Sequence, residues 1–453
     1  MSHKTGVITR FPPSPTGLLH IGSVRTALFN YLFAKKDDGK MLFRVEDTDT
    51  LRSKKEFEDD IVRSLEWLGL TWDNKEIVRQ SERNDVYKKY LKKLIDEGKA
   101  FVSKETPKEP GGREEVIRFK NANKKIAFDD LIRGTIEFDT TELGDFIIAK
   151  SLDEPLYHLA VVIDDFEAGV THVIRGEDGI SNTPRQILIQ EAIGAPRPVY
   201  AHLPLVLDAQ RAKLSKRKHG EKVSLRYYIE QGYLPSAILN YMALLGWNPG
   251  TDQEIFTLPE LIQIFDIKKV HKGGAIFDEE KLRWINKEHL KRLAPEAFNS
   301  LIKARLPEKF TNDKRQLEKI LNLIKERITI LSEINVMVES GELHYFFEKP
   351  LVVQEKLMWK GESDATKTAA RLESIVLLVK AMSEEVDWNT EAIKKAIMPF
   401  ADKEGRGGVL WPMRVALSGK DKSPDPFTLA YMLGKEETIS RLTEAYNVLS
   451  KSK

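Results

Sequence analysis

Over roughly its first 250 residues the chain alternates short apolar strands with helices, and this alternation constrains the fold more than any other feature. The segments that carry the pattern are residues 7–11, 41–46, 57–68, 146–149, 159–163 and 172–175. Gly69 follows the helix predicted over residues 57–68. A further helix is predicted to begin with Thr183 as its N-cap and Pro184 as its first residue, and to end before Gly194. Alternating strands and helices predict a parallel sheet, with ligands at the carboxyl ends of its strands.

The pattern changes after Phe277, where strands become rare. Apolar residues recur at helical spacing over residues 317–338, 366–382, 390–401 and 428–433. The C-terminal third is therefore predicted to be an all-α bundle. Residues 103–125 fit neither pattern, because they are polar and charged and contain Pro107 and Pro110, so we expect a loop there.

Length and composition narrow the class of protein. With 453 residues the chain exceeds what a single hydrophobic core usually organises, so about two to four domains are expected. No apolar run approaches the length of a membrane-spanning helix, and the first residues lack the apolar core of a signal peptide. The absence of cysteine excludes disulfides and thiolate metal sites. We expect a cytoplasmic protein that does not contact a membrane.

The net charge of +2 results from 71 basic and 69 acidic residues and by itself indicates no partner. Basic side chains do recur between residues 268 and 315. If several of them share a face, they can follow the phosphate backbone of a nucleic acid. The alternative is a set of solvated helix faces in a chain that is 31% charged.

A proline-stiffened turn at residues 13–22 (Pro-Ser-Pro-Thr-Gly-Leu-Leu-His-Ile-Gly) joins the first predicted strand to an apolar helix. A helix start presents free backbone N–H groups and the positive end of its dipole, and both favour phosphate. His20 can donate a hydrogen bond to a phosphate oxygen, and Gly22 lets a base or a phosphate approach the backbone. A P-loop is disfavoured, because Ser23 stands where its lysine would be.

A second segment, residues 213–217 (Lys-Leu-Ser-Lys-Arg), follows an apolar run at 203–207. Its two lysines and arginine can offset the charge that builds on a departing pyrophosphate. Most basic stretches of this length are solvated loops or general anion patches. Together with the first segment, however, this one predicts an ATP site. The turn at 208–211 is expected to be flexible, so that the loop can close over ATP.

The two segments resemble the HIGH and KMSKS motifs of class I aminoacyl-tRNA synthetases. Other segments are similar, in order, to glutamyl-tRNA synthetases of the bacterial type: residues 10–17, 44–49, 157–160, 172–178, 273–278, 281–284 and 414–419. The resemblance spans the whole chain. It implies an α/β fold in which a Rossmann-like, parallel-sheet catalytic domain carries an inserted acceptor-binding domain and is followed by the all-α bundle.

The resemblance also implies a division into domains. Residues 1–86 and 164–208 would form the two halves of the catalytic domain, and residues 87–163 the insertion that binds the tRNA acceptor end. Residues 209–292 would form a stem-contact domain with the KLSKR loop, and residues 293–453 the helical anticodon-binding domain. The insertion is shorter than in relatives and lacks the cysteines that bind zinc in some of them, so no zinc and no other protein-bound metal is expected.

The resemblance assigns five residues to glutamate. Arg10 would pair with the side-chain carboxylate and Arg175 with the α-carboxylate, with the Ser14 hydroxyl nearby. Glu46 would hold the ammonium group, and Tyr157 would line the pocket. Two arginines and one glutamate would then balance two carboxylates and one ammonium. The alternative is that Arg10, Glu46 and Arg175 pair with one another as structural ions.

The two motifs are assigned to ATP. The ATP-binding set is Thr16, Gly17, His20, Gly22, Lys213, Leu214, Ser215, Lys216 and Arg217, with His20, Gly22, Lys213 and Lys216 as its catalytic members. Asp49 would bind the terminal adenosine of the tRNA. The α-carboxylate of glutamate would attack the α-phosphorus of ATP, with Mg²⁺ bridging phosphate oxygens, and a ribose hydroxyl of the tRNA would then displace AMP. The resemblance implies L-glutamate, ATP and tRNA(Glu) as partners of a monomeric enzyme, and it leaves tRNA(Gln) open as a second acceptor.

Four other functions are alternatives to a glutamyl-tRNA synthetase. Glutaminyl-tRNA synthetase is the nearest, but its relatives carry a β-barrel anticodon domain. A small-molecule adenylate-forming nucleotidyltransferase, or an enzyme that charges a modified base, does not account for the helical third. A catalytically silent tRNA-binding paralogue belongs to another class, and the intact His20 and Lys216 argue against it. The chain departs from the family at three places. Ser23 stands at the fourth HIGH position, the second motif has Leu214 and ends in Arg217, and Gly179 stands where a bulkier side chain is common, so one pocket wall is expected to be looser.

Overall fold

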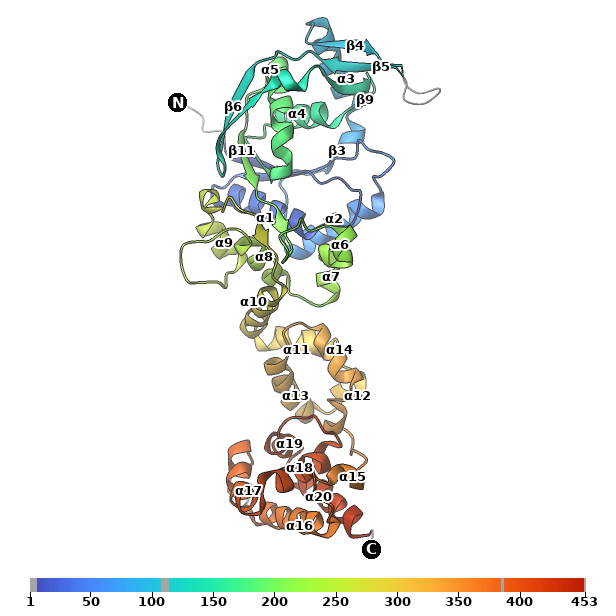
Figure 1. Cartoon of the computed structure of the whole chain (residues 1–453), viewed down its shortest axis with the longest axis vertical. Helices are drawn as coiled ribbons and strands as arrows, with labels where there is room; N and C mark the ends of the chain where they lie inside the picture. Colours follow the sequence, from blue (N-terminus) through green and yellow to red (C-terminus); the bar gives the residue numbers. More distant parts are fainter. Residues whose placement is uncertain (1–5, 107–113, 384–386, 452–453) are drawn as a thin grey trace. The chain divides into compact units, whose positions relative to one another are not determined.

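The computed structural model describes residues 6–106, 114–383 and 387–451 of the chain. Contacts between residues divide it into two compact units, Met1–His289 and Leu290–Lys453 (Figure 1). The first unit contains strands and helices, and the described part of the second contains helices. The predicted change from an α/β to an all-α pattern is therefore confirmed.

The strands of the first unit are β1 (Ile8–Phe11), β2 (Lys40–Val45), β3 (Val78–Arg79), β4 (Ala100–Lys104), β5 (Glu115–Phe119), β6 (Lys125–Asp130), β7 (Gly134–Asp139), β8 (Phe146–Ser151), β9 (Glu154–Pro155), β10 (His172–Gly176), β11 (Val199–Leu203), β12 (Val206–Leu207) and β13 (Ala275–Ile276). Its helices are α1 (Ile21–Lys36), α2 (Lys55–Leu68), α3 (Asn84–Asp96), α4 (Tyr157–Glu167), α5 (Thr183–Ile193), α6 (Lys216–His219), α7 (Leu225–Glu230), α8 (Pro235–Leu244), α9 (Leu258–Ile264) and α10 (Glu279–Arg292), the last of which contains the boundary between the units.

The strands that precede the site are parallel, as predicted. β1, β2 and β3 form one parallel sheet, and β10 pairs in parallel with β11. Thr171, just before β10, donates its amide to the Ile8 carbonyl at 2.9 Å, and the Ile8 amide donates to the Thr171 hydroxyl at 2.8 Å. These hydrogen bonds join the start of β1 to the start of β10.

The prediction of a loop over residues 103–125 was wrong in part. β4 and β5 pair antiparallel there, with Ala100 opposite Phe119, in a sheet that also holds β8 and β9. Ile117 and Phe119 are buried while most side chains of β4 are exposed. An edge hairpin with so few inward apolar residues has a weak alternation, so turn residues dominated the pattern. Residues 107–113, which hold Pro107 and Pro110, lie outside the described residues.

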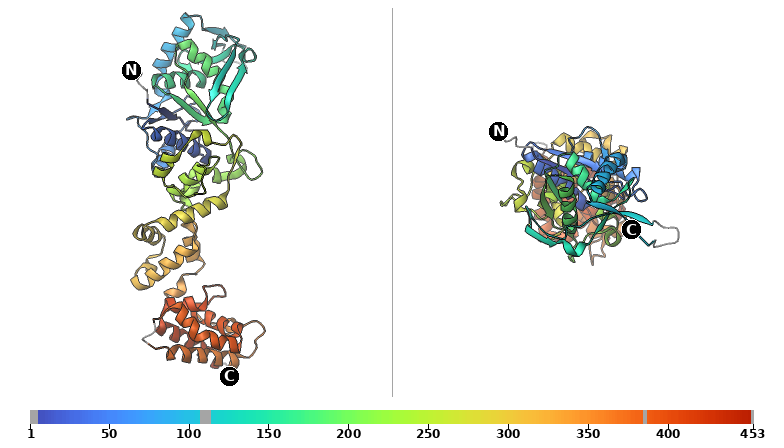
Figure 2. Two further views of the ribbon diagram at one scale, coloured as in Figure 1. Left: turned by 90° about the vertical axis from the view of Figure 1, so that its left-hand side faces the viewer. Right: turned by 90° about the horizontal axis from the view of Figure 1, so that it is seen from above.

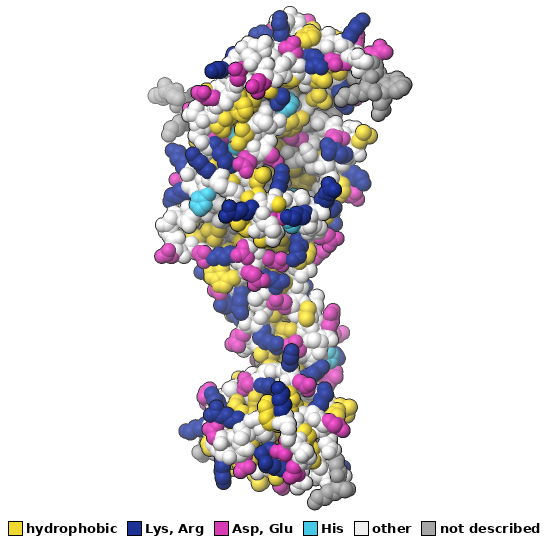
Figure 3. Space-filling view, in the orientation of Figure 1, with side chains coloured by type: hydrophobic (Ala, Val, Ile, Leu, Met, Phe, Trp, Pro, Cys, Tyr) yellow, Lys and Arg dark blue, Asp and Glu magenta, His cyan; other side chains and the backbone are white. Residues whose placement is uncertain are grey.

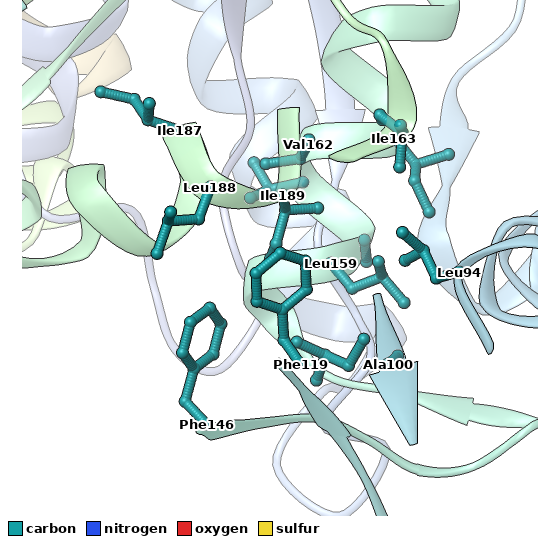
Figure 4. Close-up of a cluster of buried hydrophobic side chains, with 14 of the residues drawn as sticks. Leu94, Ala100, Phe119, Phe146, Leu159, Val162, Ile163, Ile187, Leu188 and Ile189 are labelled. Atoms are coloured by element: carbon teal, nitrogen blue, oxygen red, sulfur yellow. The ribbon is translucent and has the colours of Figure 1, made fainter. Parts of the chain in front are cut away.

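A buried hydrophobic cluster packs α4 and α5 against these strands (Figure 4). Its members include Leu94, Ala100, Phe119, Phe146, Leu159, Val162, Ile163, Ile187, Leu188 and Ile189. The apolar segment 159–163 is the middle of α4. Because the cluster holds α4 and α5 in place, it fixes Tyr157 at the first position of α4 and Thr183 at the first position of α5.

Helix ends follow the predicted signals closely. α2 and α5 end at Gly69 and Gly194, whose φ angles of 73° and 79° are left-handed and suit glycine. α5 begins one residue earlier than predicted, since Asn182 is its N-cap and Thr183 its first residue. The Thr183 amide donates to the Ile180 carbonyl of the preceding 3₁₀ turn (Glu177–Asn182), which leads directly into the helix. The Thr183 hydroxyl does not cap the helix and bonds within the site instead.

The helices of the second unit are α11 (Pro295–Lys303), α12 (Glu308–Thr311), α13 (Lys314–Arg327), α14 (Ser332–Glu339), α15 (Gln354–Leu357), α16 (Ala365–Ala381), α17 (Thr390–Glu404), α18 (Arg406–Ser418), α19 (Pro426–Leu433) and α20 (Lys435–Ser450). Figure 2 shows the C-terminal helices, from α16 onward, packed against one another. Among them, α16 lies along α20. The helices predicted at 366–382, 390–401 and 428–433 are confirmed.

The single helix predicted over residues 317–338 is in fact two, α13 and α14. Ile328 is extended, and the amide and hydroxyl of Thr329 donate to the Glu333 carboxylate at 2.5 and 3.0 Å. Ile330, Leu331 and Ile334 remain buried through the break. The apolar spacing therefore continued where the helix did not, because local side-chain bonds to the backbone compete with helical ones.

The surface carries mixed charge. On the face shown in Figure 3, Lys and Arg side chains are interspersed with Asp and Glu. Within the basic segment at 268–315, Lys281 pairs with Glu254 and Lys309 with Glu348. These two lysines thus form ion pairs on the surface, as expected if the basic residues lie on solvated helix faces and not on a nucleic-acid-binding face. Among the described residues, no helix is both long and apolar enough to cross a membrane.

Candidate active site

The residues predicted for glutamate meet in one cavity of about 560 Å³. It lies where β1, β2 and β10 end and where α1 and α4 begin. Its lining includes Arg10, Ser14, Thr16, Gly17, His20, Glu46, Tyr157, Arg175 and Gly179. Segments from the first 50 residues and from residues 157–182 thus contribute to the same site.

Arg10 is buried and is held by a carboxylate that the sequence did not point to. Its Nε donates to both oxygens of Asp165 on α4, at 3.3 and 3.2 Å. Its Nη1 is buried and has no hydrogen-bond partner among the described residues. A buried donor without an acceptor is costly, so this nitrogen is suited to a carboxylate that enters the cavity.

Glu46 is buried at the end of β2 and pairs with Arg44, whose Nη2 donates to Oε1 at 3.0 Å. Arg44 also pairs with Asp165 at 2.8 Å and lies 3.6 Å from Asp164. The alternative in which Arg10, Glu46 and Arg175 pair with one another is therefore wrong. Arg10 pairs with Asp165 and Glu46 pairs with Arg44.

Burial and charge act in opposite directions on these groups. Burial raises the pKa of Glu46 above its usual value and outweighs the opposing effect of Arg44. Burial alone would raise the pKa of Asp165 as well, but Arg10 and Arg44 together hold it below its usual value. The positive charges around Glu46 thus do not fully offset its burial, and an ammonium group beside it would add the charge that does.

Arg175 is the other arginine of the cavity, and its contacts are to neutral groups. Nε lies 3.2 Å from His202 Nε2, and Nη2 donates to the Gly179 carbonyl at 3.0 Å and the Thr183 hydroxyl at 2.8 Å. A Cβ added at Gly179 would lie 2.5 Å from Arg175 Nε. The expected looser wall at Gly179 is not observed, because the Arg175 side chain occupies that space.

His20 is the N-cap of α1, with its Nδ1 accepting from the Gly22 amide at 2.9 Å. Because Nδ1 is the acceptor, the ring proton of the neutral form lies on Nε2. Burial and the nearby Lys213 lower the pKa of His20. A Cβ at Gly22 would lie 3.2 Å from His20 Nδ1, so the missing side chain makes room for the imidazole. His20 is therefore a neutral hydrogen-bond donor at the helix start.

The KLSKR segment meets the first motif in the structure. A second cavity of about 420 Å³ is lined by His20, Gly22, Lys213, Leu214 and Ser215 and shares His20 with the first. The chain after the segment is bonded to the first motif, since the Leu225 amide donates to the Leu19 carbonyl at 2.9 Å. The two motifs, almost two hundred residues apart in sequence, are thus neighbours.

Not every predicted residue reaches these cavities. Lys216 and Arg217 are exposed on α6 and line neither cavity in the described part of the chain. The turn at 208–211, which was expected to be flexible, is tied down by hydrogen bonds to Asp208. This carboxylate accepts from the Gln210 and Ala212 amides and from the side chains of Lys218 and His219.

Asp49 lines a neighbouring cavity of about 820 Å³, which shares Ser14, Glu46 and Tyr157 with the cavity of about 560 Å³. Arg52 Nε donates to Asp49 at 2.6 Å, and this hydrogen bond lowers the pKa of Asp49.

Family models match both parts of the chain. The model for tRNA synthetases class I (E and Q), catalytic domain, matches residues 6–110 and 108–284, and the model for the anticodon binding domain matches residues 288–446. The glutamate–tRNA ligase of Aquifex aeolicus is 39% identical over 98% of this chain and 99% of that protein. That of Carboxydothermus hydrogenoformans is 38% identical over 97% and 100%. This chain belongs to the glutamate–tRNA ligase family of class I aminoacyl-tRNA synthetases.

Solved structures of the glutamate–tRNA ligase family share the fold. A crystal structure of a glutamate tRNA ligase from Elizabethkingia meningosepticum in complex with its amino acid has a TM-score of 0.84 and 35% identity, covering 98% of this chain and 99% of that one. A structure from Elizabethkingia anophelis has a TM-score of 0.81, also at 35% identity, with 98% and 100% covered. The family and the Rossmann-like fold class predicted from the sequence are thus confirmed.

Three charged residues next to the cavity were not predicted from the sequence. Arg44 pairs with Glu46 and Asp165, Asp165 pairs with Arg10, and Asp164 lies beside Arg44. One signal was available: Arg44 and Glu46 are two apart on a strand and share a face. A second was the acidic pair Asp164–Asp165 that follows an apolar helical segment. Both are buried, and buried carboxylates require partners.

Metal ligation is not provided by a cluster of protein side chains in the described residues. No group of three or more His, Asp or Glu residues there is arranged to hold an ion.

Proposed function

We propose that the protein activates L-glutamate with ATP and transfers it to the terminal adenosine of tRNA(Glu). The observation that supports this most directly is the charge pattern of the 560 Å³ cavity. Arg10 offers a free buried donor, Arg175 has only neutral partners in the described residues, and Glu46 has a raised pKa. Two cations and one anion complement the two carboxylates and one ammonium of glutamate.

The same pattern argues against glutamine as the substrate. A glutamine side chain is neutral, so it would bring no side-chain carboxylate to the free donor of Arg10. A site built to pair a charged group discriminates strongly against the uncharged analogue, because its own buried group is then left unpaired. The complete cavity also argues against a catalytically silent tRNA-binding paralogue.

In the first step Arg10 and Arg175 hold the two carboxylates and Glu46 holds the ammonium, with Ser14 and Tyr157 lining the pocket. The α-carboxylate oxygen attacks the α-phosphorus of ATP, and the bond to the pyrophosphate oxygen breaks. His20 donates from Nε2 to a phosphate oxygen, and the amides at the start of α1, with Thr16 and Gly17, face the nucleotide. No protein nucleophile is required, so positioning and charge stabilisation provide the catalysis.

Lys213 and Lys216 are assigned to the departing pyrophosphate, with Leu214, Ser215 and Arg217 forming the rest of the loop. Lys213 pairs with Asp178 at 3.0 Å, and Asp178 lines both cavities. Lys216 is exposed, so its contact with the nucleotide requires the loop to move toward the cavity. In the second step a ribose hydroxyl of the terminal adenosine, with Asp49 beside it, attacks the carbonyl of glutamyl-adenylate and AMP leaves.

We also propose the wider organisation of the enzyme. Residues 1–86 and 164–208 form the catalytic domain, 87–163 the acceptor-end insertion, 209–292 the stem-contact domain and 293–453 the anticodon-binding domain. The enzyme works as a cytoplasmic monomer with Mg²⁺·ATP and no zinc. tRNA(Gln) is a possible second acceptor. Support comes from the separate compact unit at Leu290–Lys453 and from the anticodon model matched there.

Aminoacylation with labelled glutamate, ATP and Mg²⁺ tests the proposal on purified tRNA(Glu) and tRNA(Gln) in parallel. Wild-type protein should charge tRNA(Glu), and Lys216→Ala should lower the rate about a hundredfold, as expected for the loss of one charge contact worth about 3 kcal/mol. Lys222→Ala is the matched control, because Lys222 is an exposed lysine close in sequence that pairs with Glu279 and should retain activity.

Charging of tRNA(Glu) alone would define a discriminating enzyme, and charging of both tRNAs a non-discriminating one. Charging of neither tRNA by folded protein would contradict the proposed function.

A further inference from the structure

The guanidinium of Arg175 is oriented by neutral acceptors. Nη2 donates to the Gly179 carbonyl and to the Thr183 hydroxyl, and Nε lies 3.2 Å from His202 Nε2. No carboxylate in the described part of the chain forms an ion pair with it, in contrast to Arg10 and Arg44. A carboxylate partner would compete with the substrate for the positive charge, whereas neutral acceptors orient the group and leave its charge for a ligand.

His202 can serve as one of these acceptors only if Nε2 carries no proton, and Asp130 determines this. The His202 side chain is fully buried on β11, and its Nδ1 lies 2.6 Å from Asp130 Oδ2. The His202 amide donates to the same oxygen at 3.0 Å. An ionised carboxylate only accepts hydrogen bonds, so the ring proton lies on Nδ1 and Nε2 is left as an acceptor for the Arg175 Nε–H.

The backbone holds Asp130 in its ionised form at the end of β6. Its Oδ1 accepts from the amides of Ile132 and Arg133, each at 2.9 Å. Burial alone would raise the pKa of Asp130, but the hydrogen bonds from His202 and these amides hold it below its usual value. Burial also lowers the pKa of His202, which keeps the ring neutral. Asp130, His202 and Arg175 therefore form a chain in which each hydrogen bond has a defined direction.

We propose that His202 and Asp130 are positioning residues for glutamate: Asp130 sets the tautomer of His202, and His202 Nε2 aims the Arg175 guanidinium at the α-carboxylate of the substrate. Thr183 and Gly179 complete the cradle, since a Cβ at Gly179 would clash with Arg175 Nε. The inference rests on the proposed function, because it takes the α-carboxylate as the ligand of Arg175. Asp130 belongs to the segment proposed as the acceptor-end insertion, so through His202 this segment would help to position Arg175.

Two substitutions of His202 separate positioning from simple packing. His202→Leu removes the acceptor, and His202→Gln places an amide oxygen where it can accept from Arg175. In aminoacylation of tRNA(Glu), His202→Leu should raise KM for glutamate roughly tenfold to a hundredfold, the range for loss of a hydrogen bond to a charged group. His202→Gln should recover most of that loss, and KM for ATP should stay within about twofold of wild type for both variants.

A substrate fragment tests which carboxylate is concerned. γ-Aminobutyrate keeps the amine and the side-chain carboxylate of glutamate but lacks the α-carboxylate. Its inhibition constant against glutamate should be the same for wild type, His202→Leu and His202→Gln. Parallel losses for glutamate, γ-aminobutyrate and ATP would show a structural role and overturn the inference, as would an unchanged KM for glutamate in His202→Leu.

Should His202→Leu fail to fold, Thr183→Val decides the question. It removes the hydroxyl that accepts from Arg175 Nη2 while keeping the shape of a buried side chain. A rise in KM for glutamate alone supports the cradle, and no rise contradicts it. Wild-type charging of tRNA(Glu) is measured in the same assay, so a failure of the proposed function would be seen in the wild type and a failure of this inference only in the variants.

Discussion

Replacing His20 by asparagine should lower kcat for aminoacylation about a hundredfold while leaving the stability of the protein almost unchanged. The imidazole has two separate tasks in this structure. Nδ1 caps α1 by accepting from the Gly22 amide, and the Nε2–H is the donor that we assign to a phosphate oxygen. Asparagine is among the best N-cap residues, so it keeps the first task, but its short side chain cannot perform the second.

Single-turnover formation of glutamyl-adenylate and thermal unfolding, measured on the same preparations, would check this. His20→Ala is the matched control, because it removes both tasks and should also cost about 1 kcal/mol of stability through the lost cap. If His20→Asn forms the adenylate at the wild-type rate, the catalytic contribution of His20 is only that of a helix cap, and the assignment of its Nε2 to phosphate fails.

Arg44→Met should lower the free energy of unfolding of the first unit by about 3–5 kcal/mol, the cost typical of removing one partner from a buried ion cluster. Arg44 is buried among Glu46, Asp164 and Asp165, which raise its pKa although burial alone would lower it. Methionine fills a similar volume without charge. The three carboxylates would then lose their shared cation, although Asp165 keeps Arg10 and Asp164 keeps Arg83.

The loss should depend on pH in a defined direction. Burial already raises the pKa of Glu46 against the opposing effect of Arg44, so without Arg44 this pKa should rise further above that of the unfolded chain. Groups with raised pKa values favour the folded state when protonated, so the penalty should be full at neutral pH and shrink as the pH falls toward 4, near the ordinary carboxyl range.

Urea unfolding followed at several pH values measures this difference. Arg52→Met is the matched control, since Arg52 is exposed and pairs with Asp49, and surface pairs are usually worth about 0–1 kcal/mol. A difference between Arg44→Met and wild type that stays constant from pH 7 to about pH 4 would contradict the account of the carboxylate cluster.

Much of the fold was predictable because its signals are local. The strand–turn–helix around His20, the glycine ends of α2 and α5 and the α-helical second unit all depend on residues within a few turns of one another. Local signals misled where tertiary packing opposed them. The apolar spacing across Ile328 continued through a helix break, and the sparse apolar residues of β4 and β5 concealed a paired hairpin.

The sequence by itself determined which chemical groups are present: a helix start with His20, a basic loop, two arginines and a glutamate at strand ends. It could not determine their partners. Arg10 meets Asp165 across 155 positions, Lys213 meets Asp178, and His202 meets Asp130 from another strand. Such pairs form because a buried charge must find compensation wherever the fold brings a carboxylate or an acceptor near. Tertiary structure alone thus decided that Arg10 and Glu46 have separate partners and that the hydrogen-bond partners of Arg175 are neutral.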